Sequence, residues 1–137
     1  MEEKKEMIRV LYCEPGMLAV SREIGTELHD LQRAVGGGFI ETYYPFEEEV
    51  CIVCNDEGKF NGMRPCRAIF GEDGKMTDVI FGPFFICDCS TENFKSLSDD
   101  HMKRYQEQFR FPEHYYRAEG ELKAVRYDPV RNLGWDR

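Results

Sequence analysis

The sequence predicts an α+β fold, in which a mostly antiparallel sheet is packed against two helices. Three observations favour this class. Short apolar runs of strand length are separated by turns rich in Gly, Pro, Asn and Asp, and two other segments repeat apolar residues at three- and four-residue spacing. The chain has 137 residues, of which 42% are apolar, which is enough to bury one core.

The first elements are predicted to be a hairpin and a helix. Residues 8–13 predict a strand that ends at the Pro-Gly turn 14–16, and residues 18–24 predict its antiparallel partner. Thr26 is expected to cap the following helix. That helix ends at the glycines 36–38, which can adopt the left-handed conformation common at helix C-termini. Its apolar face consists of Leu28, Leu31 and Val35.

The middle of the chain is predicted to complete the sheet. Residues 39–44 predict a third strand that stops at a proline, and residues 50–54 predict a fourth, buried strand. Residues 61–71 are expected to be a loop that leads into a short strand or a turn. Residues 78–89 predict a long β segment that is bent or broken at Gly82-Pro83.

A second helix is predicted after Ser98, whose hydroxyl suits an N-cap. Met102, Tyr105 and Phe109 then share one helical face, and Pro112 ends the helix because proline cannot donate the next backbone hydrogen bond.

One domain is expected to cover residues 7–117. Residues 118–137 contain apolar residues without a clear period, so they are predicted to be a C-terminal extension. Three interpretations of this extension stay open: a strand, an arm that lies on a neighbouring protomer, or a partly mobile tail.

The charge pattern argues against some classes of partner. The formal net charge is −8, which argues against direct binding to nucleic-acid phosphates. Residues 1–60 hold 13 acidic and 6 basic side chains. Within them, the run Glu47–Glu49 is interpreted either as a solvated face or as a mimic of nucleic-acid phosphates.

The sequence also bears on location. The N-terminal residues carry mixed charges instead of the apolar stretch of a secretory signal, and no apolar run is long enough to span a membrane. We therefore expect a cytoplasmic protein.

Six cysteines are present, and reduced thiols are expected in the cytoplasm. Cys51-x-x-Cys54 and Cys87-x-Cys89 have a spacing that resembles a zinc site. Residues three apart on a strand point to opposite faces, however, and no turn with Gly or Pro lies between Cys51 and Cys54, so the context is poor for a zinc site. Buried hydrophobic cysteines are therefore predicted, with zinc binding and redox chemistry as the alternatives.

No catalytic motif for a nucleophilic hydrolase, a phosphate-cradling loop or a zinc protease occurs in the chain. An enzyme is therefore not expected, and neither a cofactor nor a metal is predicted. Residues 81–117 instead combine many aromatic side chains with arginines.

This aromatic and basic stretch predicts a pocket for a nucleotide-like small molecule. Aromatic faces stack on flat heterocycles, and guanidinium groups hold phosphates. Arg110 flanks the apolar face of the second helix, where it can reach into a cleft, and Asn93 can contact a base edge or a ribose. The alternative interpretation is that the aromatic side chains simply form the core.

Several strings of the sequence together resemble a family of phage and mobile-element proteins, known mainly as a domain of unknown function and found in elements that carry antirestriction genes. The strings are Leu31-Gln32, Val35-Gly36-Gly37, Ile40-Glu41, Cys54-Asn55-Asp56-Glu57-Gly58-Lys59, Asp78-Val79-Ile80, Phe84-Phe85-Ile86, Glu92-Asn93-Phe94 and Phe109-Arg110. The resemblance covers residues 7–116. Cys66 departs from the pattern, because a polar residue is expected before Arg67.

The same layout is similar to the phage Thoeris anti-defence sponges, which sequester cyclic ADP-ribose-type immune signals, and in some cases cyclic oligonucleotides, without degrading them. This resemblance implies a homo-oligomer with ligand pockets between protomers. It also implies that Phe84 stacks on adenine. Asn93 and Arg110 would contact ribose and pyrophosphate, and Arg67 would serve a second, phosphate-binding site.

These observations lead to one hypothesis and two alternatives. The hypothesis is a non-enzymatic anti-defence protein that sequesters a cyclic nucleotide or cyclic ADP-ribose-type signal, because sequestration needs complementarity to an intact ligand and no acid–base groups. One alternative is an acidic inhibitor of a host defence nuclease that acts through Glu47–Glu49. The other is an accessory protein of a mobile element without a small-molecule ligand.

Overall fold

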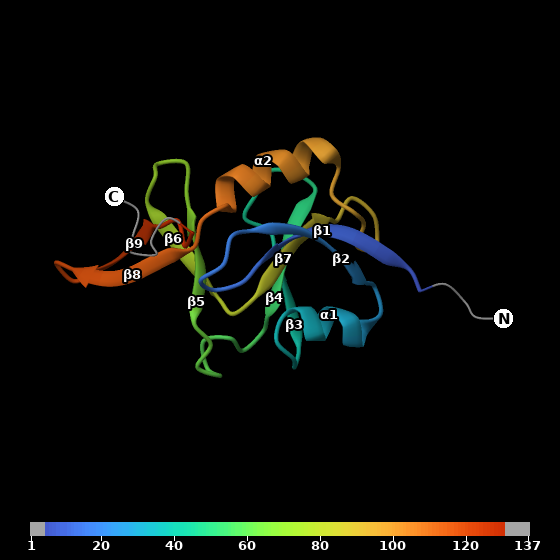
Figure 1. The fold of residues 1–137 in the computed structure, drawn as a ribbon, viewed down its shortest axis with the longest axis horizontal. Helices are drawn as coiled ribbons and strands as arrows, with labels where there is room; N and C mark the ends of the chain where they lie inside the picture. Colours follow the sequence, from blue (N-terminus) through green and yellow to red (C-terminus); the bar gives the residue numbers. More distant parts are fainter. Residues whose placement is uncertain (1–4, 131–137) are drawn as a thin grey trace.

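A computed structural model describes residues 5–130, which form an α+β fold (Figure 1). One five-stranded sheet and two two-stranded sheets account for the strands of the described chain, and all of their pairings are antiparallel. Two helices pack against the larger sheet. The fold class predicted from the sequence is confirmed.

The larger sheet has the strand order β2-β1-β7-β4-β3. Its strands are β1 (Met7–Cys13), β2 (Val20–Gly25), β3 (Ile40–Tyr43), β4 (Val50–Asn55) and β7 (Phe84–Asp88). β7 is central and pairs with β1 on one side and β4 on the other. Every residue of β4 is buried, because both faces of the sheet are covered and the strand is a continuous apolar run.

The two helices cover opposite faces of this sheet, as Figure 1 shows above and below it. α1 (Leu28–Ala34) covers one face. α2 (Asp99–Phe109) covers the other face, together with a hairpin formed by β5 (Pro65–Phe70) and β6 (Met76–Phe81). The predicted apolar residues of the second helix are all buried in this second layer.

The helix ends follow the predictions in part. Ser98 caps α2, since its hydroxyl accepts a hydrogen bond from a backbone N–H of the first turn at 3.1 Å. The predicted cap at Thr26 is wrong, because Glu27 occupies the N-cap position of α1 and the Thr26 hydroxyl donates to Glu6 Oε1 at 3.2 Å. The glycines 36–38 have φ values of +92°, +95° and +84°, as expected after a helix.

The predicted strands are largely present. β1 and β2 form the expected hairpin. The segment 61–71, expected to be a loop that leads into a short strand or a turn, contains the six-residue strand β5. The predicted break at Gly82-Pro83 is confirmed, because β6 before it and β7 after it belong to different sheets.

A third hairpin follows α2 and projects from one end of the molecule in Figure 1. Its strands are β8 (Glu113–Ala118) and β9 (Glu121–Arg126). The predicted boundary between residues 117 and 118 therefore falls inside a paired element, and the first part of the extension forms a strand. Residues 131–137, the last part of that predicted extension, lie outside the described residues.

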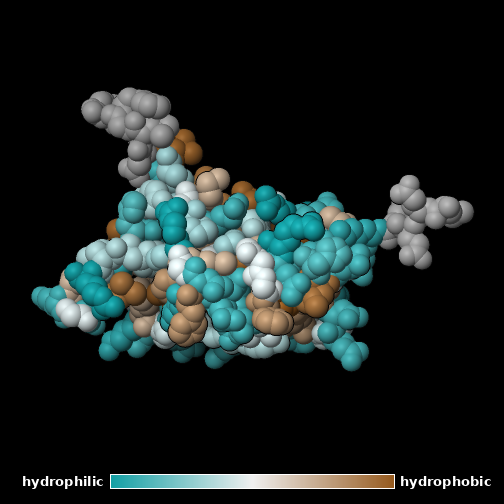
Figure 2. Space-filling model, turned by 90° about the horizontal axis from the view of Figure 1, so that it is seen from below, coloured by the Kyte–Doolittle hydropathy of each residue, from teal (hydrophilic) through white to brown (hydrophobic). Residues whose placement is uncertain are grey.

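No helix within residues 5–130 is long and apolar enough to cross a membrane. The face that carries α1 and β3 is mostly hydrophilic, with separate hydrophobic patches (Figure 2). Single apolar side chains such as Leu28, Phe39 and Phe60 are exposed. Isolated exposure of this kind is common on protein surfaces and does not by itself mark an interface.

Candidate functional site

An open groove of about 780 Å³ lies between α2 and the connection from β1 to β2. Small-molecule sites typically enclose ~300–1,000 Å³, so the groove is large enough for a nucleotide-sized ligand. Its apolar part is formed by Leu18, Val20 and Met102, and its basic side chains are Arg9, Lys103 and Arg110.

Helical spacing directs one side of α2 into the groove. Lys103, Gln106 and Arg110 follow one another at intervals of three and four residues, so they lie on one helical face. The end of this helix is tied to the strand connection, because Ala19 N–H donates to the Arg110 carbonyl at 2.9 Å. Gln106 Nε2 also donates to the Ala19 carbonyl, at 3.4 Å. These two hydrogen bonds fix the two walls of the groove relative to each other.

The groove is locally basic in an acidic chain. Three basic and two acidic side chains line it, whereas the whole chain carries a net charge of −8. Arg9 Nη2 lies 3.4 Å from Asp99 Oδ1; the Arg9 side chain is half exposed and the Asp99 side chain is almost fully exposed. Exposed ion pairs of this kind contribute ~0–1 kcal/mol, so Arg9 can exchange this partner for a ligand phosphate at little cost.

Arg110 is both exposed and held in place. It occupies the C-cap position of α2, and its guanidinium carbon lies 5.5 Å from the centroid of the Phe111 ring. A guanidinium that rests on an aromatic ring keeps its N–H donors free for an anion. Arg110 therefore lies in the groove at the end of α2, beside the apolar face of the helix.

The other exposed candidate, Asn93, does not line the groove. It is exposed in the loop between β7 and α2. The sequence reasoning missed Lys103 and Arg9. Helical spacing could have identified Lys103, because it lies seven residues before Arg110 on the same helix face. No sequence pattern could have identified Arg9, because its position depends on the packing of β1 under α2.

Phe84 is a core residue, so its predicted contact with adenine needs correction. Its ring is 0% exposed and packs edge-to-face on Phe109, with ring centroids 6.2 Å apart. No face of the ring is open to a ligand in this chain. The residue instead stabilises the layer between the sheet and α2, as the alternative interpretation of the aromatic stretch expected.

Arg67 is also buried, at 0% exposure, which corrects its predicted role in a phosphate site. Its Nε donates to the Phe109 carbonyl at 2.8 Å and its Nη2 donates to the Met17 carbonyl at 2.7 Å. Its Nη1 donates to the carbonyls of Cys66 at 2.9 Å and Glu14 at 3.4 Å. The guanidinium therefore joins the turn after β1, strand β5 and the end of α2, and these carbonyls use the donors that a phosphate would need.

Glu48, at the centre of the acidic run 47–49, forms an ion pair with Arg104. Arg104 donates to both carboxylate oxygens of Glu48 at 2.9 Å. Tyr105 Oη also donates to this carboxylate, and His101 Nε2 lies 3.0 Å from it. The hydrogen bonds from Arg104, Tyr105 and His101 lower the pKa of Glu48 to about 2. Glu48 thus anchors the loop before β4 to α2.

The cysteines follow the strand geometry. Cys51 and Cys54 belong to the core clusters on opposite faces of the sheet, as their spacing predicted. Cys51 instead faces Cys87 across the ladder, with 3.9 Å between their sulfur atoms. All six cysteines are free thiols, and five of them are buried.

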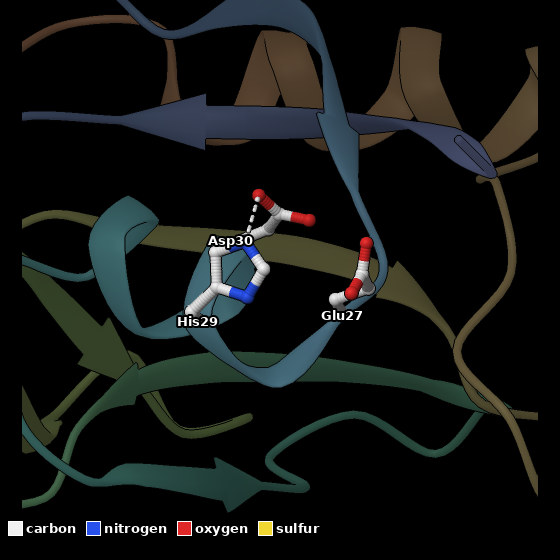
Figure 3. Close-up of side chains that lie close together, drawn as sticks. All are labelled: Glu27, His29 and Asp30. Atoms are coloured by element: carbon white, nitrogen blue, oxygen red, sulfur yellow. Dashed lines mark ion pairs between the residues drawn. The ribbon is translucent and has the colours of Figure 1, made fainter. Parts of the chain in front are cut away.

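One cluster of potential metal ligands occurs in the described chain: Glu27, His29 and Asp30 (Figure 3). Asp30 Oδ1 is 2.7 Å from the Lys5 ammonium, which lowers the pKa of this carboxyl. Its other oxygen has no hydrogen-bond partner and lies against Gly25, where a Cβ would overlap with it. Lys5 thus supplies the positive charge that the buried carboxylate needs, and we assign the cluster no metal.

Comparison with known proteins identifies the family of this chain. No curated protein sequence and no solved structure matches it. Residues 8–110 match a domain of unknown function, DUF3846. This match spans the larger sheet, both helices and the β5–β6 hairpin, and it ends at the groove residue Arg110. The chain therefore belongs to the DUF3846 family.

Proposed function

We propose that this protein is a phage or mobile-element anti-defence protein that sequesters an anionic, nucleotide-type immune signal without cleaving it. The ligand would be a cyclic ADP-ribose-type molecule or a cyclic oligonucleotide, held in the groove beside α2. The observation that carries the proposal is the convergence of Arg9, Lys103 and Arg110 on one groove in an otherwise acidic chain.

The chemistry of the groove suits a phosphate-bearing ligand with an apolar part. Arg9 and Arg110 can each donate paired N–H groups to phosphate oxygens, and Lys103 adds a point charge. The ring and ribose would lie over the apolar wall of Leu18 and Val20. Because the groove is open, a second copy of the chain would cover the exposed side of the ligand. A homo-oligomer is therefore part of the proposal.

Calorimetry with cyclic ADP-ribose isomers and cyclic di- and trinucleotides tests the proposal. We expect heat of binding with at least one of them. Arg110→Ala should weaken that binding about ten- to one-hundredfold, because hydrogen bonds to charged groups contribute ~1.5–3 kcal/mol. Arg33→Ala is the matched control, since Arg33 is an exposed arginine on α1, on the opposite face of the sheet.

Two results would contradict the proposal. Absence of heat with every ligand at tens of micromolar protein would leave the alternative of an accessory protein without a small-molecule ligand. Chromatography of ligand recovered after heat denaturation separates storage from turnover, because a chemically changed ligand would identify an enzyme.

The second candidate, an acidic inhibitor of a defence nuclease, has weaker support. It depends on carboxylates that are free to replace nucleic-acid phosphates. All three acids of the run are exposed, but Glu48 is paired with Arg104 in a bidentate contact. This candidate therefore depends on Glu47 and Glu49. Charge reversal at these two residues would abolish activity if this candidate were correct.

A further inference from the structure

A second cleft has the opposite charge. It encloses about 300 Å³ between β3, the end of β4 and β6. Three carboxylates line it, together with three aromatic rings. They are Glu41, Asp56 and Asp78, and Tyr43, Phe60 and Phe81. The carboxylates come from β3, the turn after β4, and β6, so the tertiary fold brings them together.

One buried thiol, that of Cys54, lies in the same cleft. Cys54 Sγ lies 4.0 Å from Glu41 Oε1. Burial, followed by the charges of Glu41, Asp78 and Asp56, raises the pKa of Cys54 to about 12. The cleft thus has a negative potential that acts on the groups inside it.

No close ion pair in the described chain neutralises this negative charge. Among residues 5–130, none of the three carboxylates lies within 4.0 Å of a basic side-chain nitrogen. Asp78 Oδ1 accepts one hydrogen bond, from the N–H of Val79 at 2.8 Å. Carboxylates that share a site repel one another, so a bound cation would relieve the repulsion.

The chain itself shows which kind of cation fits. Lys59 lines the same cleft, and its ammonium lies 5.6 Å from the centroid of the Phe81 ring. Aromatic faces attract alkylammonium groups at this distance. At the rim, Phe60 is 87% exposed, with a ring face available for a methylene chain.

From this arrangement we infer that the cleft binds a small organic polycation of the polyamine class. Ammonium groups of the ligand contact the three carboxylates, and its methylene chain lies on Phe60 and Phe81. The ammonium of Lys59 competes for the same place. Among the described residues, only Glu27, His29 and Asp30 bring three potential metal ligands within 4.8 Å of one another, so the carboxylates of the cleft do not form a three-ligand metal site. The proposal is therefore specific to organic cations. It is independent of the function proposed for the groove.

Calorimetric titration of the full chain with spermidine tests this inference. Asp78→Asn keeps the shape of the side chain and removes its charge, so spermidine binding should weaken about tenfold. Phe81→Leu should weaken it about fivefold through loss of the ring. Lys59→Met should strengthen it about fivefold, because the competing ammonium is removed.

Two control variants distinguish binding of spermidine in the cleft from its non-specific attraction to an acidic protein. Glu72→Gln removes one exposed carboxylate outside the cleft and should leave the affinity unchanged. Arg110→Ala should also leave the spermidine affinity unchanged, because Arg110 lies in the groove and not in the cleft. Absence of spermidine binding would therefore not contradict the function proposed for the groove. The inference is overturned if spermidine does not bind at millimolar concentration, or if Mg²⁺ displaces it at equal concentration. It is also overturned if Glu72→Gln weakens spermidine binding as much as Asp78→Asn does, or if Lys59→Met fails to strengthen spermidine binding.

Discussion

The buried layer between the larger sheet and α2 and the open groove beside α2 contain similar residue types. These residues differ in exposure and in hydrogen bonding between the two regions. In the layer, Phe84 and Arg67 are completely buried, and every donor group of Arg67 meets backbone carbonyls. In the groove, Arg110 rests on the Phe111 ring and presents its donors to solvent. The difference shows that residue type alone does not mark a ligand site, because exposure and free donors decide it.

The comparison predicts that changes in the layer affect stability and changes in the groove affect binding. Arg67→Ala should have the largest effect. It leaves carbonyls from three segments without their donor and opens a cavity, so unfolding should become easier by about 3–5 kcal/mol. Urea denaturation followed by circular dichroism measures this loss. A variant as stable as the wild type would show that the guanidinium is not an anchor.

Phe84→Leu should have the second largest effect on stability. The smaller side chain leaves part of the ring volume empty against Phe109, which should lower the free energy of unfolding by about 1–2 kcal/mol. Ligand affinity, measured on the folded variant, should stay unchanged. If affinity fell by tenfold while the variant stayed folded, the Phe84 ring would contact the ligand and would not be only a core residue.

The pH dependence of stability tests whether Glu48 anchors the loop before β4 to α2. Its pKa of about 2 lies below the ordinary value of 4.5, so its pairing stabilises the fold above about pH 4.5 and this contribution is lost as pH falls towards 2. Glu48→Gln should therefore flatten the decline in stability between these pH values, as measured by acid denaturation. Glu47→Gln, a neighbouring exposed acid, should keep the decline of the wild type.

Asn93→Ala should have the smallest effect. Asn93 is exposed on a loop and does not line the groove, so stability should change by less than ~0.5 kcal/mol. Binding should be unchanged if the ligand lies beside Arg110. A tenfold loss of affinity would place the ligand beside this loop, as the resemblance to the sponges implied.

The sequence predicts an element well where a local residue determines it. Ser98 caps α2 and the glycines 36–38 end α1, because cap and turn conformations depend on nearby residues. Arg67 could not be placed in this way. Its hydrogen bonds reach carbonyls at residues 14, 17 and 109, which only the tertiary fold brings together.

The candidate site shows the same limit. Arg110 was predictable from its position at the edge of the apolar face of α2, and Lys103 follows from the same spacing. Arg9 lies on a different element, and its side chain reaches the groove because β1 packs beneath α2. Cavities depend on such long-range packing, so neither the groove nor the acidic cleft could be derived from the sequence alone.

A crystal structure of the protein with its tightest-binding cyclic nucleotide would test the central claim most directly. We expect phosphate oxygens within hydrogen-bond distance of Arg110 and Lys103, with the ligand chemically intact over Leu18 and Val20. A ligand bound away from α2, in the acidic cleft or beside Asn93, would contradict it.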